Sequence, residues 1–345
     1  METSSTITNL HVALVYNLKR NPHQEEEAEF DSQTTIDAIL STIIELGYKN
    51  VFPIEADKNL VENLLKYQID VVFNIAEGLE KRSRESQVPA ICDLLDIEHT
   101  GSDTTALAIT HDKILAKRLL IQDNILTPKY IVYNGKSLPR ETISSLRFPV
   151  IIKPSHEGSS KGIDNLSVVD TIEEFETVVV TKWKAFQQPI LCEEYIVGQE
   201  YTIAVLGDEN SDLNDLQIIG PMEVSWKTTD KYPIYTYQYK LSLTYFSSTC
   251  PVKFDNEEQM ANVCMFAKRV FVSLGCRDVC RIDFRIDNEG SIYFLELNGI
   301  PGIAPNFSDL PVMANKCGIS YKTVIERILT PSVNRYIKKK LTKTQ

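Results

Sequence analysis

Two short segments near the end of the chain decide the fold: residues 281–284 (RIDF) and residues 294–302 (FLELNGIPG). Their apolar and polar alternation is typical of β-strands, and an Asp-Asn-Glu-Gly turn lies between them. Side chains alternate between the two faces of a strand. Arg281 and Asp283 therefore share a face, and so do Glu296 and Asn298. Neighbouring antiparallel strands of this kind bring the two pairs together.

These four side chains form a candidate metal site. The oxygens of Asp283, Glu296 and Asn298 suit a hard cation, Mg²⁺ or Mn²⁺, that keeps room for phosphate. The alternative is an ordinary hairpin with a solvated polar face. If Asp283 were the only acidic residue here, this alternative would be favoured. The combination of two acids, an amide and an arginine, followed by Pro-Gly, favours the metal site.

A second motif is the Gly/Ser loop at residues 153–162 (KPSHEGSSKG). A predicted strand over residues 148–153 ends at Lys153. Backbone N–H groups in such loops cradle phosphates, and the lysine adds a positive charge. The spacing is not that of a Walker A motif. Taken alone, a loop with two glycines is a turn more often than a phosphate site.

The third motif is the strand over residues 190–194, which ends in Glu193 and Glu194 and is followed by Tyr195 and Glu200. One interpretation is a solvated sheet edge. The functional interpretation is a hinge whose backbone pairs with a nucleotide base, with Glu200 on a ribose.

The first hundred residues alternate buried strands with helices. Residues 11–16, 51–54 and 70–74 are predicted strands, and residues 34–46 and 58–67 are predicted helices. This order indicates a parallel sheet with right-handed crossovers, in which ligands bind beyond the carboxyl ends of the strands. Further along, the predicted helices are 112–123, 171–183, 256–274, 311–316 and 321–329, and the predicted strands are 127–133, 279–286 and 291–297.

Net charge, apolar runs and cysteine spacing limit the partners and the compartment expected for this protein. The 345 residues include 36 basic and 47 acidic side chains, a net charge of −11, which disfavours a nucleic-acid partner. The basic cluster 338–340 is predicted to be a solvated terminus. We see no signal peptide and no apolar run long enough to span a membrane. The seven cysteines are irregularly spaced and are interpreted as reduced thiols, mostly in the core, so the expected compartment is the cytoplasm.

From Val12 to Leu329 the order DK…KPSxEGSSxG…EExxxGxE…RIDF…ELNxxPG resembles the ATP-grasp superfamily, and within it the D-alanine–D-alanine ligase group. The resemblance implies an α/β ATP-grasp fold. A Rossmann-like domain over residues 1–104 would precede two subdomains, 105–192 and 193–345, that clasp ATP. It also implies amino-acid-like substrates and a homodimer through the first domain.

The resemblance assigns a role to each matching residue. Lys113, Lys153 and Lys240 would bind ATP phosphates under a mobile loop. Residues that would contact the rest of the nucleotide or close over it are Gly158, Ser159, Ser160, Glu193, Glu194, Tyr195 and Glu200. Two Mg²⁺ ions would be held by Asp283, Glu296 and Asn298. Arg281 and the backbone N–H of Gly302 would stabilise an oxyanion, and Ser308 would contact the acceptor carboxylate.

The substrate pocket departs from the family pattern. The amino-group-binding glutamate best matches Glu29, with Glu25, Glu26 and Glu27 competing for the role. Ala76-Glu77-Gly78 replaces the usual His-Gly, and Leu241 replaces the usual tyrosine. The loop before Ser308 is one residue longer. Glu77, Arg82 and Arg84 are candidates to read a different substrate; the alternative is an exposed charged loop.

Because the ATP motifs are intact and the pocket motifs are not, we expect an ATP-dependent carboxylate–amine ligase that joins amino acids through an acyl phosphate. One alternative is a ligase that attaches an amino acid to a specialised natural-product or peptide scaffold. Another is a nucleotide-binding regulatory protein without catalysis, which the presence of the metal and oxyanion residues disfavours.

Overall fold

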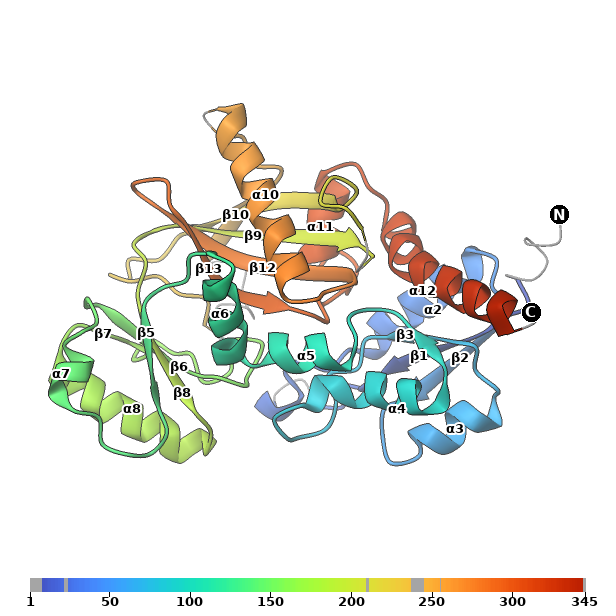
Figure 1. Cartoon of the computed structure of the whole chain (residues 1–345), viewed down its shortest axis with the longest axis horizontal. Helices are drawn as coiled ribbons and strands as arrows, with labels where there is room; N and C mark the ends of the chain where they lie inside the picture. The colour runs from blue at the N-terminus through green and yellow to red at the C-terminus, as the bar shows by residue number, and fades with distance from the viewer. Residues whose placement is uncertain (1–7, 22–23, 209–210, 237–244, 255, 344–345) are drawn as a thin grey trace.

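The computed structural model describes residues 8–21, 24–208, 211–236, 245–254 and 256–343. These residues form three β-sheets, one parallel and two antiparallel, that follow one another along the sequence. Figure 1 shows the first sheet and the other two at opposite ends of an elongated molecule, with the C-terminal helix returning to the first sheet. Within the described residues, no helix has both the length and the apolar character needed to cross a membrane.

The first sheet confirms the predicted alternation of strands and helices. Its parallel strands, in the order β2-β1-β3-β4, are β1 (His11–Tyr16), β2 (Asn50–Glu55), β3 (Val71–Asn74) and β4 (Glu98–His99). The helices of this region are α2 (Gln33–Glu45), α3 (Leu60–Lys66) and α4 (Gln87–Leu95), of which α4 is not predicted by the sequence pattern. Ser32 begins α2 by accepting a hydrogen bond from the backbone N–H of Thr35.

Helices α5 (Thr104–His111) and α6 (Lys113–Gln122) lead to the central sheet. Its antiparallel strands, in the order β5-β8-β6-β7, are β5 (Tyr130–Tyr133), β6 (Val150–Pro154), β7 (Val168–Val169) and β8 (Ile190–Glu194). The short helix α7 (Arg140–Ile143) and the longer α8 (Ile172–Phe186) complete this unit. Because β8 spans the predicted domain boundary at residue 192, we propose that the boundary follows Glu194.

The third sheet carries the segments that decide the fold. Its antiparallel strands, in the order β11-β10-β9-β12-β13, are β9 (Gly198–Gly207), β10 (Gln217–Trp226), β11 (Phe246–Thr249), β12 (Asp278–Asp287) and β13 (Ile292–Asn298). Helix α10 (Glu257–Ser273) packs against it through Val263, Ala267 and Val270. Asp283 pairs with Glu296, and Arg281 pairs with Asn298, which confirms that the two strands are antiparallel neighbours.

The chain ends in α11 (Asp309–Lys316) and α12 (Tyr321–Lys343). The prediction that the last helix stops at Leu329 is wrong, because α12 continues through Pro331. Lys338 and Lys340 are exposed, as predicted for a solvated basic terminus, and the partly exposed Lys339 pairs with Asp96 at 2.6 Å. Apolar residues of α12 are buried in one core with β1 and β3, and this packing outweighs the local cost of the proline.

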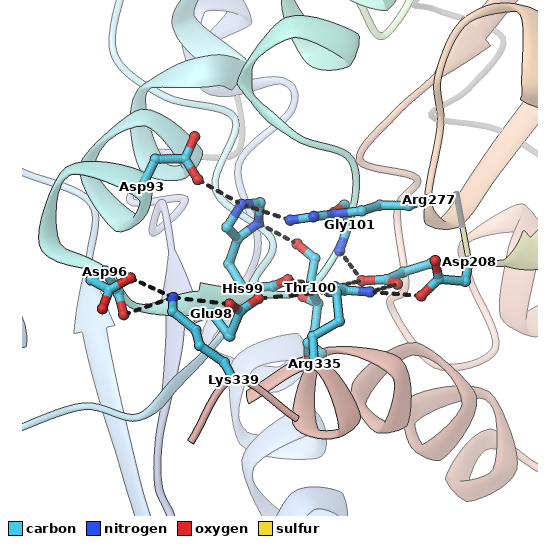
Figure 2. Close-up of polar contacts among 12 residues, drawn as sticks. Asp93, Asp96, Glu98, His99, Thr100, Gly101, Asp208, Arg277, Arg335 and Lys339 are labelled. Carbon is cyan, nitrogen blue, oxygen red and sulfur yellow. Dashed lines mark hydrogen bonds and ion pairs between the residues drawn. The ribbon is translucent and has the colours of Figure 1, made fainter. Parts of the chain in front are cut away.

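A cluster of buried charges joins α12 to the first and third sheets (Figure 2). The Arg335 guanidinium donates to both carboxylate oxygens of Asp278, at 2.8 and 2.7 Å, and to the backbone oxygen of His99 at 3.0 Å. Asp278 is completely buried and also accepts from the backbone N–H of Gly101. Arg277 donates to the Nε2 atom of His99 at 3.0 Å. These bonds connect three segments that are far apart in the sequence.

The position of His99 predicts a dependence of stability on pH. Burial and the Arg277 guanidinium lower the pKa of His99 to about 4. Since this pKa lies below the unfolded value of about 6.5, the stability that neutral His99 contributes is present above that pH and is lost as the pH falls. We expect His99 to reduce the free energy of unfolding by about 2 kcal/mol between roughly pH 7.5 and pH 5.

Urea unfolding at several pH values tests this expectation. His99→Gln cannot titrate, so its free energy of unfolding should fall less steeply over the same pH range than that of the natural chain. Equal slopes for the two proteins would show that other groups cause the acid sensitivity.

Candidate active site

A cleft between the central and third sheets is the candidate active site. It spans about 990 Å³ of space free of protein atoms, part of which is open to solvent. The predicted site residues that line it are Lys153, Ser160, Glu193, Glu194, Tyr195, Glu200, Arg281, Asp283 and Glu296. The fold therefore brings the three sequence motifs to one cavity.

The polar group of β12 and β13 lies at one wall of this cleft. Arg281 contacts Asp283 through two nitrogens, at 3.2 and 3.1 Å, and lies 3.5 Å from Asp309. Asn298 donates to Asp283 at 3.2 Å. Burial opposes the charge of Arg281, but Asp283 and Asp309 outweigh it and raise its pKa. The carboxylate and amide oxygens of Asp283, Glu296 and Asn298 fit a hard divalent cation.

Glu193 lies in the depth of the cleft between two lysines. Its side chain is only 1% exposed, and its Oε1 and Oε2 atoms lie 2.6 Å from Lys153 and 2.9 Å from Lys117. Burial opposes the charge of Glu193, but Lys117 and then Lys153 outweigh it and lower its pKa. Burial also lowers the pKa of Lys117, to about 8. In this structure Glu193 is therefore held by buried ammonium groups.

Lys113, predicted to bind phosphate, is the first residue of α6, and its side chain is largely buried. Its ammonium donates to the backbone oxygen of Glu157 at 2.5 Å and lies 3.3 Å from Glu296. Lys153 contacts Glu193 instead. Both lysines thus face acidic groups of the cleft, and their contact with ATP phosphates stays a prediction.

Glu200 has a fixed orientation at the other end of the cleft. Arg285 contacts it at 2.7 Å, and the guanidinium of Arg285 lies 4.4 Å from the centre of the Tyr195 ring. Arg285 also donates to the backbone oxygen of Ile196 at 2.9 Å. The neighbouring Glu194 accepts from the backbone N–H of Arg147 at 2.9 Å. These contacts fix Glu200 at the lining of the cleft, and its contact with ribose stays a prediction.

The Gly/Ser loop follows β6 and is anchored by Asp112, which begins α6. Asp112 accepts hydrogen bonds from Ser155 at 2.9 Å and Arg82 at 2.7 Å, and contacts His156 at 3.0 Å. In the loop itself, Ser159 and Ser160 adopt left-handed backbone conformations, with φ of 47° and 59°. The left-handed region costs a non-glycine residue some conformational energy, so tertiary contacts hold this loop in shape.

The predicted amino-group residue Glu29 lies directly beside this loop. A Cβ atom on Gly158 would come within 1.8 Å of the Glu29 carboxylate. Arg84 contacts Glu29 at 2.7 Å and Glu77 at 3.4 Å, and the side chains of all three are largely buried. The alternative of an exposed charged loop is therefore wrong for Glu77 and Arg84, while Arg82 is 60% exposed.

A second buried pair lies against this group. The Nδ1 atom of His111 is 2.6 Å from Glu85, and the carboxylates of Glu29, Glu77 and Glu85 lie within 4.8 Å of one another. Burial, together with Glu29, raises the pKa of Glu77 well above its ordinary value. By contrast, Glu25 and Glu26 are exposed in the short helix η1 (Glu25–Glu27), and Glu27 accepts from the backbone N–H groups of Arg20 and Asn21. The geometry therefore favours Glu29 over its three competitors.

The remaining predicted residues follow β13. Ser308 precedes α11, and its hydroxyl accepts from the backbone N–H of Ala304 at 3.1 Å. A Cβ atom on Gly302 would lie 2.9 Å from that hydroxyl, so the two positions are neighbours. Lys240 and Leu241 lie outside the described residues, and their predicted roles stay predictions.

Sequence reasoning missed two basic residues of the cleft. Lys117 lies four residues after Lys113 on α6, a spacing that places both on one helix face. Arg285 follows Arg281 and Asp283 at the strand period of two. Either spacing is a usable signal, because it marks a further basic residue on a face already identified.

The comparisons with known proteins agree with this geometry. The family model described as D-ala D-ala ligase C-terminus matches residues 122–330. A D-alanine–D-alanine ligase of Carboxydothermus hydrogenoformans is 31% identical over 86% of this chain and 92% of its own length. An uncharacterised protein of Sinorhizobium fredii is 28% identical over 93% of this chain and 94% of its own length.

Solved structures show the same fold. A D-alanine–D-alanine ligase of Bacillus anthracis, solved in complex with ATP, superposes with a TM-score of 0.74 at 18% identity and covers 96% of this chain and 99% of its own. A D-Ala:D-Ser ligase of Enterococcus faecalis gives 0.73 at 21% identity, covering 94% and 99%.

The chain thus has the fold of these ligase structures, the ATP-grasp fold. Within that class, the chain belongs to the D-alanine–D-alanine ligase family. It is an ATP-dependent, ADP-forming ligase that makes C–N bonds.

Proposed function

We propose that this ligase joins two amino acids, or amino-acid-like acids and amines, through an acyl phosphate, and that its first substrate differs from D-alanine. The observation that carries the proposal is the contrast between two neighbouring groups. Most of the described residues expected to contact ATP line one cleft, whereas Arg84 forms buried ion pairs with Glu29 and Glu77.

The proposed reaction has two steps. The carboxylate of the first substrate attacks the γ-phosphorus of ATP, giving an acyl phosphate and ADP. The neutral amine of the second substrate then attacks the acyl carbon, and phosphate leaves as the amide forms. Phosphoryl transfer depends on alignment and charge neutralisation. Lys113 and Lys153 would supply positive charge to the phosphates, and Glu200 would orient the ribose.

Asp283, Glu296 and Asn298 would hold two Mg²⁺ ions, which neutralise phosphate charge when bound. Arg281 and the backbone N–H of Gly302 would donate to the oxyanion that develops at the acyl carbon. The loop over residues 158–162 would exclude water, which otherwise hydrolyses the acyl phosphate. Glu29 would accept a hydrogen bond from the amino group of the first substrate.

One observation favours a larger acceptor as the second candidate function. Phe307, in the longer loop before Ser308, has 72% of its surface exposed. An exposed aromatic side chain beside the expected acceptor position suits an apolar scaffold or peptide end better than a single small amino acid.

The test is phosphate release from ATP and Mg²⁺ with D- and L-amino acids, singly and in pairs, followed by mass spectrometry of the products. Release with pairs other than D-alanine supports the proposal. Phosphate release when D-alanine is the only amino acid added, with formation of the D-alanine dipeptide, would overturn the proposed change in substrate. Release only when peptides or larger acids are added would favour the second candidate function.

We expect Glu29→Gln to lower kcat/KM for the first substrate by at least about tenfold, because a neutral amide loses the charge-assisted bond to the substrate ammonium. Glu26→Gln is the matched control, since Glu26 is exposed in η1, and it should leave kcat/KM unchanged. Steady-state kinetics with the pair identified above measures both. Equal effects of the two changes would contradict the assignment of Glu29.

A further inference from the structure

Two cysteines lie together behind the wall of the cleft. The sulfur atoms of Cys250 and Cys317 are 3.9 Å apart, although 67 residues separate them in the sequence. Both side chains are partly exposed, whereas Cys92, Cys192, Cys276 and Cys280 are buried. A small-molecule disulfide can therefore reach Cys250 and Cys317 more readily than these four.

The two thiols belong to elements that are already held side by side. Cys250 directly follows β11, and Cys317 directly follows α11. Lys316 donates to the backbone oxygen of Ser248 at 3.0 Å, which fixes the strand against the helix end. A disulfide needs a sulfur separation of about 2.05 Å, so rotation of the two side chains and a small backbone shift would close the gap.

We infer that Cys250 and Cys317 are a modification site at which a disulfide forms and weakens ATP binding. A low-molecular-weight disulfide, such as oxidised glutathione, supplies the oxidising equivalents. One cysteine thiolate attacks it and releases one glutathione thiol as a mixed disulfide forms. The second cysteine thiolate attacks that mixed disulfide and releases the second glutathione thiol. The two cysteines are oxidised and two glutathione sulfurs are reduced.

The connection to ATP follows from the neighbours of the two thiols. Phe246 and Ser248 of β11 line the cleft, and so does Asp309 at the start of α11. Asp309 also faces Arg281 at 3.5 Å. Drawing the ends of β11 and α11 together displaces this wall, and displacements of ångström size change the fit of a bound ligand.

The chemistry also sets the rate of the reaction. Burial and the neighbouring Cys317 raise the pKa of Cys250 to about 12, so Cys250 is almost wholly a thiol near neutral pH. Because the thiolate is the attacking form, we expect a slow reaction that accelerates with pH.

The experiment treats the full chain with oxidised glutathione at about pH 8.5, where thiolates are more abundant. Thiol counting and non-reducing peptide mapping follow the bond, and calorimetric titration with Mg²⁺ and ATP follows binding. We expect loss of two thiols, a cross-linked Cys250–Cys317 peptide, and a dissociation constant for ATP raised about threefold or more. A thiol reductant should reverse all three.

Cys264→Ser is the matched control, because Cys264 is also partly exposed but has no described thiol partner; it should behave like the natural chain. Cys250→Ser and Cys317→Ser should each abolish the cross-link. The double variant Cys250→Ala with Cys317→Ala covers the case in which one single variant fails to fold. Weakening of ATP binding by oxidised glutathione that persists in the double variant, no cross-link in the natural chain, or a cross-link that leaves ATP affinity unchanged would each overturn the inference. Because ATP binding needs no amino-acid substrate, the result does not depend on the proposed substrate.

Discussion

Arg281→Ala is expected to lower the turnover of this ligase by at least about 100-fold, the cost of removing one donor from a developing oxyanion. The guanidinium lies at the wall of the cleft and is oriented by Asp283 and Asp309. Because it would act mainly on the charge that develops during amide formation, the loss should appear in kcat more than in KM for ATP. Phosphate release with the best substrate pair measures both constants.

Two controls separate this role from damage to the site. Arg269→Ala changes an exposed arginine that donates to the backbone oxygen of Asp123, and it should leave turnover unchanged. Titration with Mg²⁺ and ATP should show that Arg281→Ala keeps its ATP affinity within about threefold. If ATP affinity falls as far as turnover, Arg281 supports the metal site and is not the oxyanion donor.

Asp278→Ala is expected to lower the free energy of unfolding by about 3–5 kcal/mol, the range for breaking a buried ion pair by removing one partner. Asp278 is completely buried and accepts both Arg335 hydrogen bonds, so its removal leaves the Arg335 guanidinium without its main partner. The same change removes the acceptor of the Gly101 backbone N–H. Urea unfolding at neutral pH measures the effect.

The matched control uses a charge pair on the same helix. Asp96 contacts Lys339 and Lys343 of α12, but its side chain is 58% exposed. Asp96 and Asp278 both have left-handed backbones, with φ of 58° and 63°, so the cost of alanine in that conformation is common to the two variants. Exposed ion pairs contribute little to stability, so Asp96→Ala should cost only about 1 kcal/mol. Similar losses for Asp96→Ala and Asp278→Ala would mean that burial of the Arg335 pair does not determine the strength of this contact.

The local pattern was sufficient for most of the elements. Period-two alternation identified β12 and β13, and period-3.6 stripes identified α2 and α10. These elements follow from which side chains must be buried, a property that each segment carries by itself. The same pattern also put Arg281 with Asp283, and Glu296 with Asn298, on shared faces. The direct pairing of Asp283 with Glu296 comes from the strand register in the structure.

The end of α12 shows where local patterns fail. The sequence pattern predicts a helix that ends at Leu329, yet α12 continues through Pro331 to Lys343. Its stability comes from apolar contacts with the first sheet and from Arg335 and Lys339. Contacts between residues more than 200 positions apart leave no periodic signal in one sequence.

The sequence by itself determined the chemistry of the cleft: which acids, amides and basic groups follow which strands, and hence the class of ligand that they suit. Only the tertiary structure decided which charges meet. In the folded chain Lys117 pairs with Glu193, and Arg84 pairs with both Glu29 and Glu77. The sulfur atoms of Cys250 and Cys317 also lie in contact. The physical reason is that residue type sets what a side chain can bind, whereas its actual partner depends on how separate elements pack and exclude water.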